Sequence, residues 1–344
     1  MPVRVHIIFY VSLFLLSAFL YWKPAYNGDI GYYIAVSAQT SGESDSTIVS
    51  YSDSILKAET PEDTYRINTE VLQGYSNGLL DYYRIKPLYI WLIRAAHSAG
   101  FSWSRATVVP SLLAFILLML FMFRWLKQVL GADALLPGLL LLFSYPIFVP
   151  ARMSTPDSLT SLFLVPLFYL FLKGGSRWAL FILLFLLVSV RLDNLLMVGI
   201  FCVGAGINAW SLENREWIRY VLIMLLLTGL TILLNVWCTD DPLWPTHMEQ
   251  VLYSGNYLWK LGKAFRFFSA SYGWLFIIIL LFMVHLFRMK VLTAEITVLF
   301  MVAAMVVLRL LIFPAYEERF FGGYYIVSFI IILRILKRWK ENVA

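Results

Sequence analysis

Residues 178–210 read WALFILLFLLVSVRLDNLLMVGIFCVGAGINAW. Nearly every position is apolar apart from one short interruption, Arg191-Leu192-Asp193-Asn194. The stretch is too long for one straight crossing of a bilayer, which takes about 20 residues. The charged interruption therefore predicts two short helices, 178–190 and 194–210, that meet at one face of a membrane.

The rest of the chain has the same character. It has 344 residues, of which 60% are apolar and 14% charged, and its mean hydropathy is +0.76. A soluble domain carries about 25% charged residues. The composition predicts an all-α polytopic membrane protein with about ten transmembrane helices in a single domain, 1–344. The apolar runs that mark the helices are 7–22, 106–123, 134–150, 158–172, 178–190, 194–210, 217–236, 267–287, 292–313 and 321–335.

One further apolar segment, 87–99, decides the topology. If it crossed the membrane, the basic clusters of the later loops would lie outside, against the positive-inside rule. The segment is also short and carries Arg94 and His97 near its middle. We therefore expect an amphipathic helix on the outer leaflet that begins at Pro87, with both chain termini cytoplasmic. The basic clusters lie in 124–133, 173–177, 211–219, 288–291 and the C-terminal tail.

This topology places two large segments outside, 23–105 with its juxtamembrane helices and 237–266. The net charge of +6 comes from Lys and Arg at helix ends, without a basic face that carries interleaved aromatic residues. A nucleic-acid partner is therefore excluded. The chemistry of the protein is expected at the non-cytoplasmic face.

Charged residues recur at the outer ends of the expected helices. Charge at the membrane surface is costly to bury, so these residues are expected to converge on a polar cavity. They are Asp29, Arg84, Lys86, Arg152, Asp157, Arg191, Asp193, Glu317, Glu318 and Arg319.

Some of these residues have a structural alternative. Asp157 could N-cap the helix that starts beside it. Arg191 and Asp193 could pair only to hold the helical break. Arg309, near the outer end of an apolar run, could snorkel to the interface or reach a phosphate.

The order and spacing of these residues resemble the GT-C superfamily of membrane glycosyltransferases, in the branch with protein O-mannosyltransferases and aminoarabinose transferases. In that family an acidic residue follows the first helix and a proline-containing element opens a juxtamembrane helix. A serine-proline turn and an Arg/Asp pair come later. The matches are Asp29, Arg84 to Tyr89, Tyr145-Pro146 with Arg152 and Asp157, and Arg191 with Asp193. The resemblance covers 1–210, and 211–344 forms variable C-terminal helices.

The resemblance implies an inverting hexosyl or pentosyl transfer from a polyprenyl-phosphate donor to an acceptor hydroxyl. A carboxylate must take the hydroxyl proton, and cations must hold the leaving phosphate. The catalytic candidates are Asp29 and Asp157. The phosphate-binding candidates are Arg84, Lys86, Arg191 and Arg319. The substrate-binding candidates are Tyr32, Tyr33, Arg152, Asp193 and Glu317.

The expected partners are the lipid-linked donor, membrane lipid, and a glycan, lipid or protein acceptor at the outer face of a bacterial plasma membrane. The first loop carries Asp29 without an Asp-x-Asp pair, so no metal is assigned and a divalent metal stays open. Asp240, Asp241 and His247 fit either a metal set or a turn. The alternatives to transfer are a transporter or flippase of lipid-linked sugars, a polysaccharide polymerase or ligase, and a membrane scaffold.

Overall fold

A computed structural model of the chain describes residues 2–38, 45–62, 65, 80, 83–211, 217–238, 256–270, 273, 294–312 and 318–343. These residues form helices, and one isolated bridge pairs Ala25 with Met153. The helices are α1 (Pro2–Trp22), α2 (Ile30–Ala38), α3 (Asp45–Glu59), α6 (Pro87–Ser98), α7 (Trp103–Leu130), α8 (Leu135–Leu142), α9 (Tyr145–Phe148), α10 (Asp157–Lys173), α11 (Arg177–Val190), α12 (Leu195–Ser211), α13 (Trp217–Cys238), α16 (Ala294–Ile312) and α17 (Gly322–Val343). Short 3₁₀ turns are η1 (Gly131–Ala134), η2 (Pro150–Arg152), η3 (Leu192–Asn194) and η4 (Glu318–Phe321). The described part of the chain is all-α, as predicted.

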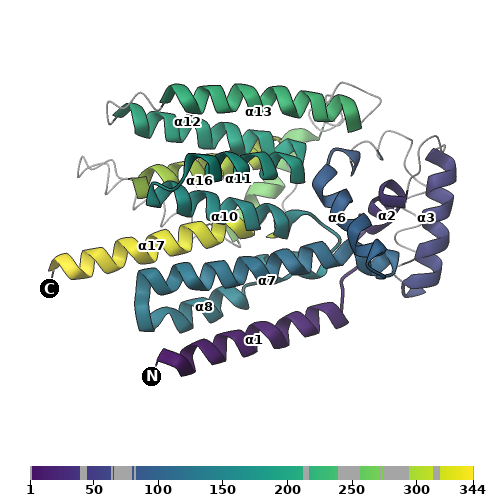
Figure 1. The fold of residues 1–344 in the computed structure, drawn as a ribbon, viewed down its shortest axis with the longest axis horizontal. Helices are drawn as coiled ribbons and strands as arrows, with labels where there is room; N and C mark the ends of the chain where they lie inside the picture. Colours follow the sequence, from purple (N-terminus) through teal and green to yellow (C-terminus); the bar gives the residue numbers. More distant parts are fainter. Residues whose placement is uncertain are drawn as a thin grey trace.

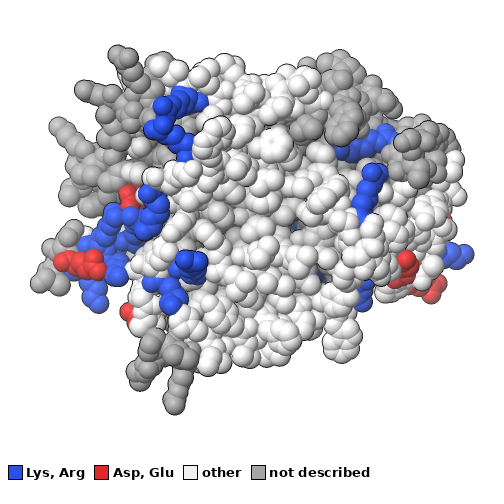
Figure 2. Space-filling view, viewed as in Figure 1, with Lys and Arg blue, Asp and Glu red and all other residues white. Residues whose placement is uncertain are grey.

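The long helices lie side by side in one bundle (Figure 1). Helices α2, α3 and α6 gather at one end of the bundle, and the two chain termini lie at the other end (Figure 1). The space-filling view has a broad band free of charged side chains between the two ends, where Lys and Arg collect (Figure 2). A band of this kind is typical of a protein that sits in a bilayer.

Four stretches of the described chain are long and apolar enough to cross a membrane. They are Trp103–Leu142, Leu192–Trp210, Ala294–Leu311 and Arg319–Glu341. Three shorter apolar helices accompany them, His6–Trp22, Arg177–Val190 and Ile218–Leu233. The predicted break in 178–210 is present, because α11 ends at Val190 and α12 begins at Leu195. Most of the expected helix 267–287 lies outside the described residues.

The apolar run 134–150 was expected to form one helix, and this prediction is wrong. Gly131, with φ +65°, lies in the left-handed region that glycine adopts freely and ends α7. Helix α8 then turns back beside α7 (Figure 1). The chain breaks again at Phe143 and Ser144, because Pro146 has no N–H for a continuing helix and instead lies in the first turn of α9. This break delivers the following turn, 150–157, to the end of the bundle.

Residues 23–105, called the outer segment after the side predicted for them, have their own apolar core at the end of the bundle. Helix α2 is buried along Ile30–Ser37 and packs against α3 and α6. Helix α6 begins at Pro87, as predicted, and buries Tyr89, Ile90, Ile93 and Ala96 while Trp91 is exposed. Its amphipathic pattern therefore covers α2 and the start of α7.

The two polar residues in the middle of α6 have structural partners. Arg94 Nε donates to Ser37 O at 2.8 Å, and Arg94 Nη2 donates to Val36 O at 3.2 Å. The guanidinium thus satisfies carbonyl groups at the C-terminal end of α2, where a cation is favoured. The His97 ring stacks on Trp103, with ring centroids 3.7 Å apart. These contacts fix α6 in place at this end of the bundle, beside α2 and the start of α7.

Candidate functional site

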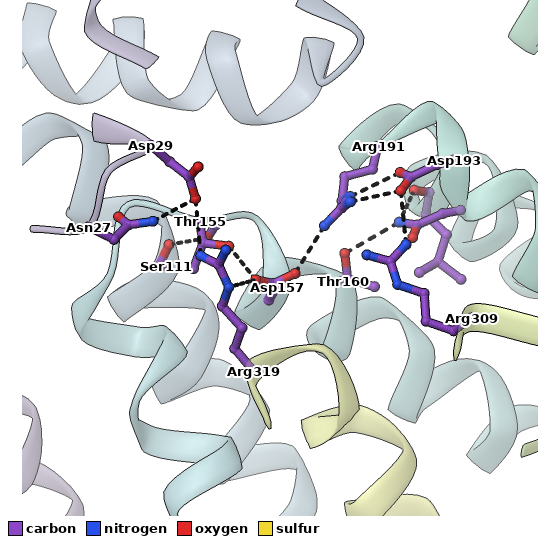
Figure 3. A network of polar contacts seen from close by, with 12 residues as sticks. Asn27, Asp29, Ser111, Thr155, Asp157, Thr160, Arg191, Asp193, Arg309 and Arg319 are labelled. Carbon is purple, nitrogen blue, oxygen red and sulfur yellow. Dashed lines mark hydrogen bonds and ion pairs between the residues drawn. The ribbon is translucent and has the colours of Figure 1, made fainter. Parts of the chain in front are cut away.

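Five segments that are distant in sequence meet at the end of the bundle that carries α2 and α6. The loop after α1 is joined to η2 by a hydrogen bond from Ala25 N to Arg152 O at 2.8 Å and by the Ala25–Met153 bridge. The start of α10, the break between α11 and α12, the end of α16 and the turn η4 complete the site (Figure 3). Each segment brings one or two charged side chains.

Asp29 lies in the loop between α1 and α2, and both carboxylate oxygens accept hydrogen bonds. Oδ1 accepts from Tyr83 Oη at 2.6 Å, and Oδ2 accepts from Asn27 Nδ2 at 2.6 Å. Oδ2 also pairs with Arg319 Nη1 at 3.1 Å. The carboxylate is therefore held in one orientation by groups from three parts of the chain.

Asp157 is the first residue of α10 and lies between two arginines. Its Oδ1 is 3.1 Å from Arg191 Nη1, and its Oδ2 is 3.6 Å from Arg319 Nε. Thr155 Oγ1 donates a short hydrogen bond to the same Oδ2. The described contacts of this side chain are with arginines and a hydroxyl, so Asp157 joins the charged network and is more than a helix cap.

The helical break itself contains a bidentate ion pair. Arg191 Nε and Nη2 donate to the two oxygens of Asp193 at 2.9 and 2.7 Å. Arg309, from α16, donates through Nη1 to Asp193 Oδ2 at 3.0 Å. Asp193 is thus shared by two guanidinium groups. The network runs without interruption from Asn27 and Asp29 through Arg319, Asp157 and Arg191 to Asp193 and Arg309 (Figure 3).

An aromatic layer beside Asp29 holds a buried lysine. Lys86, which is 3% exposed, lies with its ammonium 4.1 Å from the ring centroid of Tyr83 and 5.2 Å from that of Tyr33. Tyr32 stacks on the Tyr83 ring at 4.7 Å. Cation–π contacts of this kind stabilise a desolvated cation. The aromatic layer therefore positions both Lys86 and the Tyr83 hydroxyl that binds Asp29.

Phe320 provides a second aromatic surface under the arginines. The guanidinium carbons of Arg309, Arg319 and Arg191 lie 4.5, 5.2 and 5.9 Å from the centroid of its ring. One ring in the turn η4 therefore contacts three cations from three different helix ends. Such contacts favour close packing of like charges that would otherwise repel.

The network is most accessible at Asp29 and closed at Asp193. Side-chain exposure falls from 26% for Asp29 to 14% for Arg319, 6% for Asp157 and 2% for Asp193. On the closed side, beneath Asp157 and Arg191, lies a cavity of about 10 Å³, which is enough for roughly one water molecule. Solvent access to the network is therefore greatest at Asp29.

The pKa values of Asp29 and Lys86 are both shifted by burial and by neighbouring charges. Burial acts most strongly on Asp29 and would raise its pKa, but the charges of Arg319 and Lys86 outweigh burial and bring the pKa of this carboxyl below its ordinary value. The pKa of Lys86 is lowered to about 7, chiefly by burial and then by the charge of Arg191. Asp29 is therefore ionised at neutral pH, while the charge on Lys86 changes near pH 7.

Several predicted site residues do not enter this network in the expected way. Tyr32 and Tyr33 are buried in packing, 4% and 1% exposed, and present no open ring face to a sugar. Arg152 contributes its carbonyl to the loop pairing, through the hydrogen bond from Ala25 N. Arg84 is half-buried in the stretch that leads into α6. Glu317 lies outside the described residues.

Asn27, Tyr83, Thr155, Arg309 and Phe320 belong to the site but were not singled out as site residues from the sequence. Tyr83 and Phe320 carry no charge, and their roles depend on their neighbours in space. Arg309 was expected either to snorkel to the interface or to reach a phosphate, but it is 9% exposed and paired with Asp193. The signal that could have found it was its place in an apolar run, because charge there is retained for a buried partner.

A cation occupies the space between the two carboxylates nearest the opening. Arg319 contacts both Asp29 and Asp157. Among the residues that the structure describes, no group of three or more His, Cys, Asp or Glu side chains is arranged to hold a metal ion. Asp240, Asp241 and His247 lie outside those residues.

The fold and site together define a helical membrane protein with a buried network of carboxylates and arginines at one end of its bundle. Comparison of the chain with protein-family models, with curated proteins and with solved structures finds no match.

Proposed function

We propose that this chain is a GT-C-like membrane glycosyltransferase with about ten transmembrane helices. It transfers a hexosyl or pentosyl group from a polyprenyl-phosphate donor to a hydroxyl of a glycan, lipid or protein. The reaction takes place at the non-cytoplasmic face of a bacterial plasma membrane. The proposal combines the family resemblance of residues 1–210 with the chemistry of the charged network.

The observation that carries the proposal is the composition of the network and its opening. Among the described side chains, the carboxylates of Asp29, Asp157 and Asp193 face a larger number of cations, which are Lys86, Arg191, Arg309 and Arg319. While Lys86 carries its proton, the cluster has one more positive than negative charge and attracts an anion. Arginine binds phosphate with two parallel hydrogen bonds, and the most accessible cation of the network, Arg319, lies beside the most accessible carboxylate.

In the proposed reaction, the acceptor hydroxyl oxygen attacks the anomeric carbon from the side of Asp29. The bond between that carbon and the phosphate oxygen breaks, and its electron pair leaves with polyprenyl phosphate. The hydroxyl proton passes to Asp29. One displacement at the anomeric carbon inverts its configuration, which is the inverting mechanism implied by the resemblance.

Arg319 has two tasks in this scheme. It pairs with Asp29 before the donor arrives, which keeps the pKa of that carboxyl low and Asp29 ionised. When the donor phosphate binds Arg319, the cation shares its charge with the phosphate, and Asp29 becomes a stronger base. The leaving phosphate is then stabilised by the guanidinium as its charge increases.

Asp157 and Asp193 act as positioning residues in this proposal. Both oxygens of Asp157 are occupied by Arg191, Arg319 and Thr155. It therefore fixes the two arginines at a common distance, and the role of second catalytic residue predicted for it from the sequence is not retained. Asp193 holds Arg191 from below in the same way.

The location of the charges favours transfer over transport. Transporters bind their substrates near the middle of the membrane, often between broken helices of two repeated halves. Here the network lies where α1, α10, α11 and α16 begin or end, beside the helices of the outer segment (Figure 1). A charged site at this level suits a reaction on a lipid headgroup.

The test is donor cleavage by the purified full-length protein in lipid nanodiscs. Polyprenyl-monophosphate hexoses and pentoses are offered as donors, and polyprenyl-diphosphate sugars form a second set. Water, an alkyl glycoside and a Ser/Thr-containing peptide serve as acceptors. The proposal expects release of polyprenyl phosphate from at least one monophosphate donor, with the sugar recovered on an acceptor in inverted configuration.

Each other outcome has a defined meaning. Cleavage of diphosphate donors alone replaces the proposal with a polymerase or ligase. Movement of an intact donor across proteoliposomes without cleavage replaces it with a flippase. If the protein neither binds nor cleaves any of the donors, the proposal is rejected.

A further inference from the structure

A second polar cavity lies at the end of the bundle opposite the candidate site. Helix α10 begins with Asp157 in the site and ends with Lys173 at this cavity, so the two ends are separated by roughly 24 Å along the helix. The cavity has a volume of about 200 Å³. It is lined by Trp125, Gln128, Val129, Lys173, Arg334, Lys337, Arg338 and Glu341.

Cations predominate in the lining of this cavity. Three of them, Arg334, Lys337 and Arg338, lie on the last turns of α17, and Lys173 is the last residue of α10. Glu341 is the acidic residue of the lining and is 61% exposed. Figure 2 shows the same accumulation of Lys and Arg at the end of the molecule where α17 finishes.

A buried carboxylate behind the cavity holds two of the cations in place. Glu295 Oε1 pairs with Arg334 Nη2 at 3.1 Å and with Arg338 Nη1 at 2.9 Å, and Glu295 itself is 6% exposed. The two arginines are four residues apart and lie on one face of α17. Both guanidinium groups therefore keep a fixed orientation and retain further N–H donors for a ligand.

Lys337 and Lys173 are the remaining cations of the lining. Lys337 Nζ donates to Val129 O at 2.8 Å, near the C-terminal end of α7, and is 3.8 Å from Glu341 Oε1. Among the residues that the structure describes, Lys173 has no carboxylate partner. The buried Trp125 ring closes the inner side of the cavity.

The depth of the cavity matches the headgroup layer of a bilayer. Trp339 and Leu336, which neighbour the cationic face of α17, are 65% and 42% exposed. Trp178 and Trp210, at the ends of α11 and α12 on the same side, are 76% and 71% exposed. Exposed tryptophans collect at the level where acyl chains give way to headgroups.

From this geometry we propose that the cavity binds the phosphodiester headgroup of an anionic phospholipid in the leaflet opposite the candidate site. The positive-inside rule alone asks for basic residues in loops, exposed to water. It does not ask for a buried glutamate that orients two arginines at the edge of a cavity. Basic pockets between transmembrane helices on the cytoplasmic side are suited to anionic lipid headgroups.

The test is native mass spectrometry of the full-length protein with phosphatidylglycerol or phosphatidylcholine. The variant Lys173→Gln/Lys337→Gln removes two cations from the cavity and leaves both Glu295 ion pairs intact. The matched control, Arg124→Gln/Lys340→Gln, removes two exposed cations of the same end that do not line the cavity. Thermal melting in detergent establishes that both variants fold as the parent does.

The expected result is a preference for phosphatidylglycerol in the parent and in the control. The cavity variant is expected to bind it about 100-fold more weakly, from roughly a tenfold loss for each charge-assisted hydrogen bond that is removed. An equal loss in the control would mean attraction by surface charge only and would overturn the proposal. A parent protein with no preference for phosphatidylglycerol would also overturn the proposal. So would a result in which inorganic phosphate displaces the lipid and its own binding is weakened by the two variants to the same extents as that of the lipid.

Discussion

The two ends of the molecule use the same arrangement, a carboxylate shared by two arginines, in different surroundings. Asp193 pairs with Arg191 and Arg309, and the three side chains are 2%, 6% and 8% exposed. Glu295 pairs with Arg334 and Arg338, which are 20% and 53% exposed. Water therefore hydrates Arg334 and Arg338 in part, whereas it is nearly excluded from Arg191 and Arg309.

This difference explains what each end can do. A buried ion pair must compensate for the loss of hydration of its charges, so every donor and acceptor has to be placed well. The network at the site end is held in this way and suits a reaction that needs fixed geometry. At the opposite end Glu295 orients the two arginines, and because both are partly exposed, their remaining N–H donors can exchange water for a lipid headgroup at lower cost. This suits reversible binding.

The largest expected effect is at the open side of the site network. Asp29→Asn keeps the size of the side chain and removes the base, so turnover of a cleaved donor should fall by about 10²–10⁴-fold. Donor affinity should change far less. Asp53→Asn, in α3 of the same outer segment, is the control and should retain turnover. Turnover of Asp29→Asn near that of the parent would remove the catalytic role of Asp29.

A direct comparison of the two shared carboxylates comes next. Asp193→Asn leaves Arg191 and Arg309 buried without their common charge, and the loss of one partner of a buried pair costs about 3–5 kcal/mol. The free energy of unfolding, measured by denaturation in mixed micelles, should fall by this amount. An effect below about 1 kcal/mol, the range of exposed pairs, would show that the network is better hydrated than its burial indicates.

Because Lys86 is one of the cations proposed to attract the donor phosphate, its charge should make donor binding depend on pH. Its pKa is lowered to about 7, so the ammonium is charged below this pH and loses its proton as the pH rises. Donor affinity should be constant below pH 7 and fall by up to about tenfold per unit above it. Lys86→Gln should bind weakly with no such dependence. A donor affinity that rises with pH would contradict a contribution of the Lys86 charge to donor binding. The same pH profile in Lys86→Gln as in the parent would also contradict it.

The turn that carries Arg319 depends on a close backbone approach. A Cβ atom on Gly322 would lie 2.6 Å from Pro146 O, so Gly322→Ala should push the start of α17 away from α9 and destabilise the fold by about 1–3 kcal/mol. Thermal melting in detergent measures the change. The control is Gly199→Ala, whose Cβ would meet no atom within 4 Å. Equal melting of both variants would contradict the expected clash.

The smallest effect is expected at the opposite end. Glu295→Gln removes the charge shared by Arg334 and Arg338, but water can solvate both guanidinium groups, so the loss should be about 1 kcal/mol. The same denaturation assay gives the comparison with Asp193→Asn. Equal losses for the two variants would mean that the two ends do not differ in the way their exposure suggests.

The sequence by itself determined the class of the protein and much of its local structure. The break at 191–194, the start of α6 at Pro87 and the apolar character of the bundle follow from hydropathy, length and proline, which are properties of neighbouring residues. The collection of charges at one end followed from the same information, because the positive-inside rule orders the loops. Sequence reasoning failed at 134–150, where it underestimated the effect of Gly131 and Pro146.

The partners within the site were decided only by the tertiary structure. Arg319 and Asp29 are 290 residues apart, and Arg309 and Asp193 are 116 residues apart. Tyr32 and Tyr33 were expected to face a sugar, but the packing of α2 under α6 buries both. Hydropathy tells how deep in the membrane a residue lies, whereas the rotation of each helix and its neighbours depend on how all the side chains pack together. For this reason the sequence indicated that charged residues meet at one end of the bundle, and only the folded chain decided which of them form pairs.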